Sequence, residues 1–407
     1  RGASPAATAA AARHDVGLEE DCSEYTDRFL SGYDRVRLLG RGACAVVWLA
    51  TPVGQRGCAP VAIKQIAKGA NAKRLSDAAA ARKEIFFGSY LFHAGGEPKL
   101  SPAHYPGIAH ITRLLNHMET KRDIWLVMDY GGTSLTKMAY EIRGEFHRGE
   151  RLYRVNHMPL LQSMKQSPAV LKGMLSQLMS ALCVFADHQI VHSDIKPDNI
   201  LIEQDGHQGL RARFIDLGSA FGFGSGEGAG VATPEYMPPE ALESCASRNS
   251  GSTVGRFSAG GGRAGGIAGN LAGGARRSAG GGDGAQRPQQ QTLLPWSFDV
   301  WSVGSILLEL CLGVPLWMAY RCRVADDQPA TLGLFAVPGR DPEKILVKQA
   351  DAVRQRGLQN VVRSSLGVPL GVDGGALLAA MLAWDPTERP SPHQVLEHTW
   401  LREASAE

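Results

Sequence analysis

Residues 190–201 read IVHSDIKPDNIL, and this stretch decides the fold of the chain. A cluster of aspartates, a lysine and an asparagine lies between two apolar, strand-like pieces, where polar side chains are costly unless they have partners or a chemical role. Asp194 can accept a proton from a substrate hydroxyl. Asn199 can bind a metal ion through its amide oxygen, and Lys196 can neutralise a transferred phosphoryl group. The stretch therefore indicates a catalytic loop.

A second segment with metal-binding character follows the first. Residues 214–218 read FIDLG, which places Asp216 at the end of a short apolar strand. A carboxylate in this position supplies a hard oxygen ligand of the kind that Mg²⁺ prefers.

Two segments nearer the N-terminus suit phosphate binding. Residues 39–47 read LGRGACAVV, and their glycines allow a tight turn whose backbone N–H groups can cradle phosphates. Residues 61–64 read VAIK and put Lys64 at the end of an apolar strand, where an ammonium group needs a counter-charge. Glu84 lies in a predicted helix twenty residues further on and has the right sign to pair with it.

In this order and at this spacing, the segments resemble the motifs of the eukaryotic-type protein kinase family. Three later features are similar too. Residues 232–240 (ATPEYMPPE) look like the end of an activation segment, and residues 299–304 (DVWSVG) look like the helix that buries an aspartate under the catalytic loop. Arg389 looks like the ion-pair partner of Glu240.

The resemblance covers residues 33–401 and implies an α+β, bilobal fold. A small β-rich N-lobe would comprise residues 33–130, and a larger helical C-lobe would comprise residues 131–401. Residues 36–39, 46–50, 61–66 and 124–128 are predicted strands of the N-lobe, and residues 78–92 are a predicted helix. Residues 171–187, 298–312 and 377–383 are predicted buried helices.

The same resemblance implies an ATP- and Mg²⁺-dependent enzyme that phosphorylates serine or threonine in protein substrates. Lys64 would hold the α- and β-phosphates while paired with Glu84. Asn199 and Asp216 would carry Mg²⁺, Asp194 would be the catalytic base, and Lys196 would complete the catalytic set.

The resemblance also assigns the residues around the nucleotide. Met128 would guard the back of the adenine pocket, and the backbone of Asp129 and Gly131 would hydrogen-bond the base. The remaining positions that would line the nucleotide, on the glycine loop and above and below the ring, are Leu39, Gly40, Gly42, Val47, Ala62 and Leu201.

Three residues depart from the family pattern. Ser193 replaces the usual arginine that binds a phosphorylated activation segment, which predicts activity without such phosphorylation. Gly88, one turn after Glu84, replaces a bulky apolar residue and suggests a helix that is shifted or easily displaced. Cys44, near the tip of the glycine loop, is interpreted either as an unmodified small residue or as a redox-sensitive thiol.

Three segments lie outside the recognised motifs. Residues 1–32 are predicted to be a disordered, alanine-rich tail, with the end of an organelle transit sequence as the alternative for residues 1–13. Residues 246–291 are predicted to be a glycine-rich disordered insertion, inert or in weak contact with anions. Residues 140–168 carry several arginines and histidines and are interpreted as a solvated loop and helix, with a docking surface for acidic partners as the alternative.

Composition limits the partners and the setting. The formal net charge of +3 in 407 residues gives no electrostatic reason to expect nucleic acid or anionic lipid as a partner. Seven cysteines without paired spacing indicate reduced thiols and an intracellular protein, cytoplasmic or nuclear, or in a plastid or mitochondrion if the transit interpretation holds. The longest apolar run, residues 306–317, is too short to span a bilayer. Composition indicates no oligomeric state.

Two other functions remain as alternatives. A pseudokinase scaffold would be expected to lose Lys64, Asp194 or Asp216, and all three are present. A small-molecule kinase of similar fold would usually lack the Pro-Pro-Glu segment that ends at Glu240.

Overall fold

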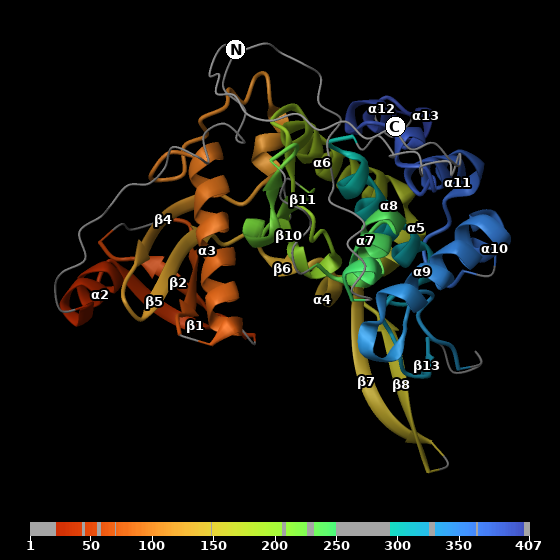
Figure 1. Ribbon diagram of the computed structural model, residues 1–407, viewed down its shortest axis with the longest axis horizontal. Helices are drawn as coiled ribbons and strands as arrows, with labels where there is room; N and C mark the ends of the chain where they lie inside the picture. Colours follow the sequence, from red (N-terminus) through yellow and green to blue (C-terminus); the bar gives the residue numbers. More distant parts are fainter. Residues whose placement is uncertain are drawn as a thin grey trace, which may run out of the picture.

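A computed structural model describes residues 22–42, 45–54, 58–69, 71–147, 149–205, 209–225, 232–249, 294–324, 330–363 and 365–402. It shows an N-terminal antiparallel sheet followed by a mainly helical region (Figure 1). The α+β, two-lobed architecture predicted from the sequence is therefore present. The predicted insertion falls almost wholly on residues 250–293, which lie outside the described residues, whereas residues 246–249 form the last turn of a helix.

The N-lobe is a five-stranded antiparallel sheet in the order β1-β2-β3-β5-β4. Its strands are β1 (Tyr33–Arg41), β2 (Ala45–Pro52), β3 (Val61–Ala67), β4 (Leu114–Glu119) and β5 (Asp123–Asp129). Successive side chains of a strand point to opposite faces. The central strand β3 therefore buries Ile66 in a cluster beneath helix α3 (Ala72–Leu91) and Ile63 in a second cluster on the other face.

Residues 22–30 correct the predicted tail. They form helix α2 (Cys22–Leu30), whose Phe29 and Leu30 pack against the apolar cluster on the outer face of the sheet. Because these two side chains find an apolar surface to cover, burial offsets the loss of chain entropy that would otherwise leave the segment disordered.

The C-lobe is built around helices α6 (Pro168–Asp187) and α8 (Ser297–Leu312), which share one large apolar core. Every residue of α8 except Leu312 is buried. The other helices of the lobe are α4 (Leu135–Ala139), α5 (Pro159–Gln166), α7 (Pro239–Asn249), α9 (Pro342–Ala350), α10 (Leu358–Val362), α11 (Gly371–Met381), α12 (Pro392–Leu396) and α13 (Thr399–Arg402). Short strands carry the catalytic loop: β6 (Thr133–Ser134), β9 (Ile190–Val191), β10 (Ile200–Asp205), β11 (Gly209–Phe214) and β12 (Phe221–Gly222).

Residues 140–157 correct the predicted loop. They form a β-hairpin of β7 (Tyr140–His147) and β8 (Glu150–His157), and β13 (Cys322–Arg323) adds a parallel strand to β8. Apolar and polar residues alternate along β7, and Gly149 adopts φ +85° in the turn, so part of the strand pattern was present in the sequence. The alternative of an acidic docking partner stays a prediction.

Among the described helices, only α6 is long and apolar enough to cross a membrane by length and composition. A core helix passes the same test, and 61% of the apolar window of α6 is buried inside the protein. Its burial against α8 and its neighbours accounts for its composition.

Candidate active site

The ammonium group of Lys64 joins the two lobes. Its Nζ lies 2.7 Å from Oε2 of Glu84 on α3 and 3.4 Å from Oδ1 of Asp216 in the C-lobe. Burial alone would lower the pKa of Lys64, but the carboxylates of Asp216 and Glu84 outweigh that effect and raise it above its ordinary value. The predicted Lys64–Glu84 ion pair is thus present, and Lys64 keeps its positive charge.

Helix α3 brings Glu84 to the lysine. The helix begins six residues earlier than predicted because the side chain of Asn71 caps it, accepting a 2.8 Å hydrogen bond from the N–H of Arg74. Burial raises the pKa of Glu84, and the charge of Lys64 acts in the opposite direction.

The predicted displacement of this helix does not occur in the structure. Gly88 is buried, and a Cβ atom at this position would lie 2.9 Å from Cβ of Leu114 on β4. Leu114 therefore occupies the space that a larger residue at position 88 would fill, and Glu84 still reaches Lys64.

Asp216 sits at a sharp backbone turn. Its φ of +67° lies in the left-handed region, which non-glycine residues seldom adopt outside constrained sites. Gly218 follows in close contact with α3, since a Cβ there would lie 3.2 Å from the carbonyl oxygen of Ala80. The charge of Lys64 lowers the pKa of Asp216 against the opposing effect of burial, so the carboxylate stays ionised.

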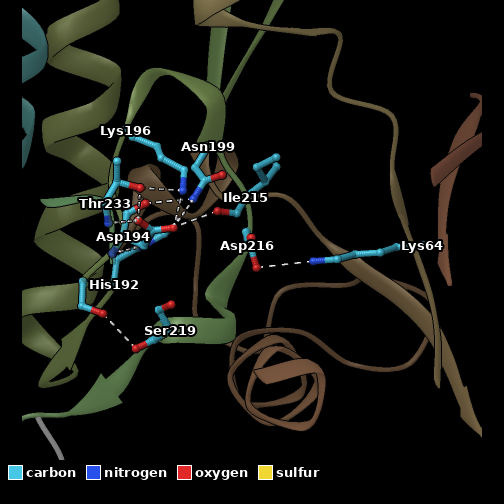
Figure 2. Close-up of polar contacts among 10 residues, drawn as sticks. Lys64, His192, Asp194, Lys196, Asn199, Ile215, Asp216, Ser219 and Thr233 are labelled. Carbon is cyan, nitrogen blue, oxygen red and sulfur yellow. Dashed lines mark hydrogen bonds and ion pairs between the residues drawn. The ribbon is translucent and has the colours of Figure 1, made fainter. Parts of the chain in front are cut away.

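The carboxylate of Asp194 is held by four donors (Figure 2). Oδ2 accepts hydrogen bonds from Lys196 Nζ at 2.7 Å and from Asn199 Nδ2 at 3.1 Å. Oδ1 accepts from the N–H and the hydroxyl of Thr233, both at 3.0 Å. Lys196 also donates to the Thr233 hydroxyl at 2.8 Å, which links the catalytic loop to the end of the activation segment.

Thr233 is the residue that the predicted site omitted. The sequence places it one residue before Pro234, but nothing in the sequence shows that its hydroxyl reaches Asp194, since the two residues are 39 positions apart.

A buried aspartate supports this loop from below, as the resemblance predicted. Asp299, on α8, accepts hydrogen bonds from the backbone N–H groups of His192 at 2.8 Å and Ser193 at 3.0 Å. Nε2 of the His192 ring forms a 3.0 Å hydrogen bond with the carbonyl oxygen of Ile215, the residue before Asp216.

The residues assigned to the nucleotide lie around Lys64. Strand register places Val47 beside Lys64 and Ala62 beside Met128, while Gly40 pairs with Val47 across the glycine loop. Met128 also packs with the apolar cluster beneath α3. Leu39 lies at a register shift of β1, and the N–H of Gly42 donates to the carbonyl oxygen of Ala45 at 2.9 Å across the loop.

The connection between the lobes brings the hinge residues to Leu201. A Cβ at Gly131 would lie 3.1 Å from Cδ1 of Leu201 on β10. Asp129 ends β5, where its carboxylate forms a two-pronged ion pair with Arg113 that fixes the start of the connection. Cys44 lies outside the described residues.

The donor set suits Mg²⁺ bound together with a nucleotide. Asn199 uses its amide nitrogen to donate to Asp194, so its amide oxygen faces the other way as a candidate ligand. Asp216 supplies an ionised carboxylate. No group of three or more His, Cys, Asp or Glu residues in the described part of the chain is arranged to hold a metal ion.

Below the activation segment, Arg389 and Glu240 form the predicted ion pair. Nη1 and Nη2 of Arg389 donate to Oε1 and Oε2 of Glu240 at 2.7 and 2.9 Å, and the guanidinium also bonds the carbonyl oxygens of Ala383 and Ser297. The arginine side chain is fully buried, so these bonds replace the water it has lost.

Comparison with known proteins agrees with this geometry. The family model described as protein kinase domain matches residues 33–261. A probable inactive protein kinase of Arabidopsis thaliana is 25% identical over 241 residues, 51% of this chain and 54% of that protein. A serine/threonine-protein kinase of Schizosaccharomyces pombe is 26% identical over 238 residues, 58% of this chain and 56% of that protein.

A serine/threonine-protein kinase of Caenorhabditis elegans is 26% identical over 228 residues, 55% of this chain and 27% of that protein. The chain thus spans about half the length, or less, of these curated relatives. The family model covers more than half of the chain, and its motifs converge on one site. The chain belongs to the protein kinase family.

Proposed function

We propose that this chain is an active, ATP- and Mg²⁺-dependent kinase that transfers the γ-phosphoryl group to serine or threonine of protein substrates. The observation that carries the proposal is a continuous set of contacts. Lys64 contacts Glu84 and Asp216. Ile215, next to Asp216, donates its N–H to the backbone carbonyl oxygen of Asn199. The side-chain amide of Asn199 in turn donates to the carbonyl oxygen of Asp194.

Each residue has a role that follows from its charge and position. Lys64 binds the α- and β-phosphates, and Asn199 and Asp216 hold Mg²⁺, which when bound neutralises charge on the phosphates. Asp194 orients the substrate hydroxyl and accepts its proton, while Lys196 offsets negative charge on the transferred group. Catalysis then consists of positioning and charge stabilisation.

The preference for serine or threonine rests on the end of the activation segment. Thr233 and Lys196 both donate to the Asp194 carboxylate, so an acceptor hydroxyl must approach it beside these two side chains. The relatives named as serine/threonine-protein kinases support the same class.

Phosphoryl transfer to a peptide library, with [γ-³²P]ATP and Mg²⁺, tests the proposal. We expect label on serine and threonine, loss of label in Asp194→Asn and Asp216→Asn, and near-normal label in Asp198→Asn. Asp198 is an exposed carboxylate in the same loop and serves as the matched control. Equal label in the wild type and Asp194→Asn would contradict the proposal, and label only on tyrosine would contradict the acceptor class.

A pseudokinase scaffold is the second candidate, because the Arabidopsis relative is named a probable inactive kinase. This candidate predicts that no condition gives phosphoryl transfer, while the fold and its ion pairs persist. Phosphoryl transfer separates the two candidates, and a thermal-shift measurement shows whether a chain without transfer still binds ATP. Phosphoryl transfer supports the enzyme. Its absence, whether or not ATP binds, supports the scaffold.

We also propose that the chain acts inside the cell. Burial raises the pKa of Cys183 to about 12, and those of Cys311 and Cys322 to about 11. These buried cysteines form no disulfide, which suits a reducing compartment.

A further inference from the structure

Strand β7 presents an open backbone edge. The β7–β8 hairpin extends beyond the helices of the C-lobe (Figure 1), and its three-stranded sheet has the order β13-β8-β7. In the described part of the chain, no strand pairs with the other side of β7. Open edges of this length are where proteins add further strands.

The hydrogen-bond pattern shows which groups face this edge. The N–H of Tyr153 donates to the carbonyl oxygen of Arg321 at 3.0 Å, so it points toward β13 and away from β7. Gly144 lies directly opposite Tyr153 and therefore belongs to a pair that exchanges no bonds across the hairpin. The N–H and C=O of Gly144 thus face outward, as do those of Ile142 and Phe146 two residues away.

We propose that β7 pairs antiparallel with β7 of a second copy of this chain, about a two-fold axis at Gly144. The two sheets then join into one six-stranded sheet. Gly144 exchanges both backbone bonds with its counterpart. Ile142 lies opposite Phe146 of the partner subunit, and Arg143 lies opposite Glu145 of the partner subunit.

The charges along β7, together with the length of paired strand, favour this register and a second copy of the chain as the partner. Pairing centred on Arg143 would set two arginines against each other and Glu141 against a glutamate, and pairing centred on Glu145 would set two glutamates against each other. A register centred on Ile142 also opposes opposite charges, Glu141 against Arg143, but it pairs only residues 140–144 and leaves Phe146 uncovered. The Gly144-centred register pairs residues 141–147 and opposes Arg143 and Glu145 twice, once on each side of the axis. The strand is therefore complementary to itself.

The side chains are already arranged for this contact. Arg143 is held by Glu141 at 2.6 Å and Glu145 by Arg154 at 2.9 Å, so both charges stand on one face of the hairpin. On the other face Phe146 is 82% exposed, and a second copy would cover it. The contact is small compared with a stable dimer interface, so the dimer is expected to depend on protein concentration.

Sedimentation velocity of the full chain over a range of concentrations tests the proposal. Wild-type protein should pass from monomer to dimer. Arg143→Glu alone and Glu145→Arg alone should each weaken the dimer by about tenfold or more, because each sets like charges against each other twice. The double variant Arg143→Glu/Glu145→Arg should dimerise more tightly than either single variant, because it restores opposite charges across the axis while losing the pairs with Glu141 and Arg154.

A mixture of the two single variants provides the decisive measurement. Arg143→Glu mixed with Glu145→Arg should form a heterodimer, because the glutamates of one copy then meet the arginines of the other. Lys137→Glu, an exposed charge change on α4 outside the strand, should behave like the wild type. A wild-type protein that stays monomeric, single variants that dimerise normally, or a mixture that stays monomeric would each overturn the proposal. The result is independent of kinase activity.

Discussion

The hydroxyl of Ser193 donates a 2.8 Å hydrogen bond to the carbonyl oxygen of Ser219, which ties the catalytic loop to the start of the activation segment. Ser193 is 1% exposed and adopts φ +64°, with its N–H bonded to Asp299. In most family members an arginine at this position would need a phosphate to make a comparable tie. Here the link joins two neutral groups and requires no added charge.

The first prediction is that activity survives dephosphorylation. Protein treated with phosphatase, and shown by mass spectrometry to carry no phosphate between residues 219 and 233, should keep its rate of peptide phosphorylation. The neutral Ser193–Ser219 bond remains in place after treatment. A loss of activity that returns on rephosphorylation would show that a phosphate organises the segment after all.

The second prediction is that Ser193→Ala lowers kcat by about fivefold, which corresponds to the roughly 1 kcal/mol of one buried hydrogen bond. KM for ATP should change little, because the Lys64 contacts are untouched. Steady-state kinetics provides the measurement. Ser163→Ala, an exposed serine on α5, is the matched control. An unchanged kcat in Ser193→Ala would mean that the bond does not position the segment.

The third prediction separates structure from catalysis at Lys64. Lys64→Met leaves Glu84, with a side chain only 7% exposed, without its cation, and should cost about 3–5 kcal/mol of unfolding free energy. Lys64→Met/Glu84→Met should recover part of that stability, because the buried Glu84 carboxylate is removed and only Asp216, whose side chain is 41% exposed, has lost its cation. Urea denaturation gives the free energies, and phosphoryl transfer should be absent from both variants. A double variant no more stable than Lys64→Met would show that the pair is not coupled.

The fourth prediction concerns the contact between Gly88 and Leu114. In most helices Gly→Ala stabilises by about 1 kcal/mol. At Gly88 the new methyl group would lie 2.9 Å from Cβ of Leu114, so Gly88→Ala should destabilise by about 1–3 kcal/mol and raise KM for ATP by displacing α3. In a Leu114→Gly background, which removes that Cβ atom, the same change should become stabilising. A double-mutant cycle measures this reversal, and the same sign in both backgrounds would rule out the contact.

The residues of the catalytic loop were predictable because their chemistry is local in sequence. Asp194, Lys196 and Asn199 stand within six positions, and their polar character between apolar strands indicates a site without any knowledge of the fold. The pairing of Lys64 with Glu84 was predictable from charge and helix placement. The hydroxyl of Thr233 on Asp194 was not, because the contact depends on how the activation segment returns to the loop.

Helix starts and inserted elements were harder to predict for identifiable reasons. The start of α3 depends on the capping side chain of Asn71, a single residue without hydrophobic periodicity. Helix α11 begins at Gly371, in a glycine-containing stretch of weak helix propensity, so tertiary packing determines where this helix starts. Apolar and polar residues alternate along β7, but the many charged residues of the hairpin made this pattern resemble a solvated loop. In the structure Val155 on β8 is nevertheless fully buried.

The fifth prediction is that the free energy of unfolding decreases as pH rises, because of Glu309 on α8. Oε2 of Glu309 accepts hydrogen bonds from the hydroxyl of Tyr236 at 2.5 Å and the N–H of Leu316 at 2.9 Å. Burial raises the pKa of Glu309 from 4.5 to about 7 despite these bonds. Between pH 4.5 and 7 the native state holds a proton that the unfolded chain has lost, so the free energy of unfolding decreases as pH rises through this window.

Glu309→Gln isolates this effect, because the amide oxygen can accept both hydrogen bonds and the side chain does not titrate. The decrease that Glu309 causes is on the order of 3 kcal/mol and is complete above the native pKa. Urea denaturation of both proteins at pH 5, 6, 7 and 8 should therefore show the variant gaining stability relative to the wild type as pH rises. Parallel pH profiles for the two proteins would mean that Glu309 is ionised in the native state throughout this range.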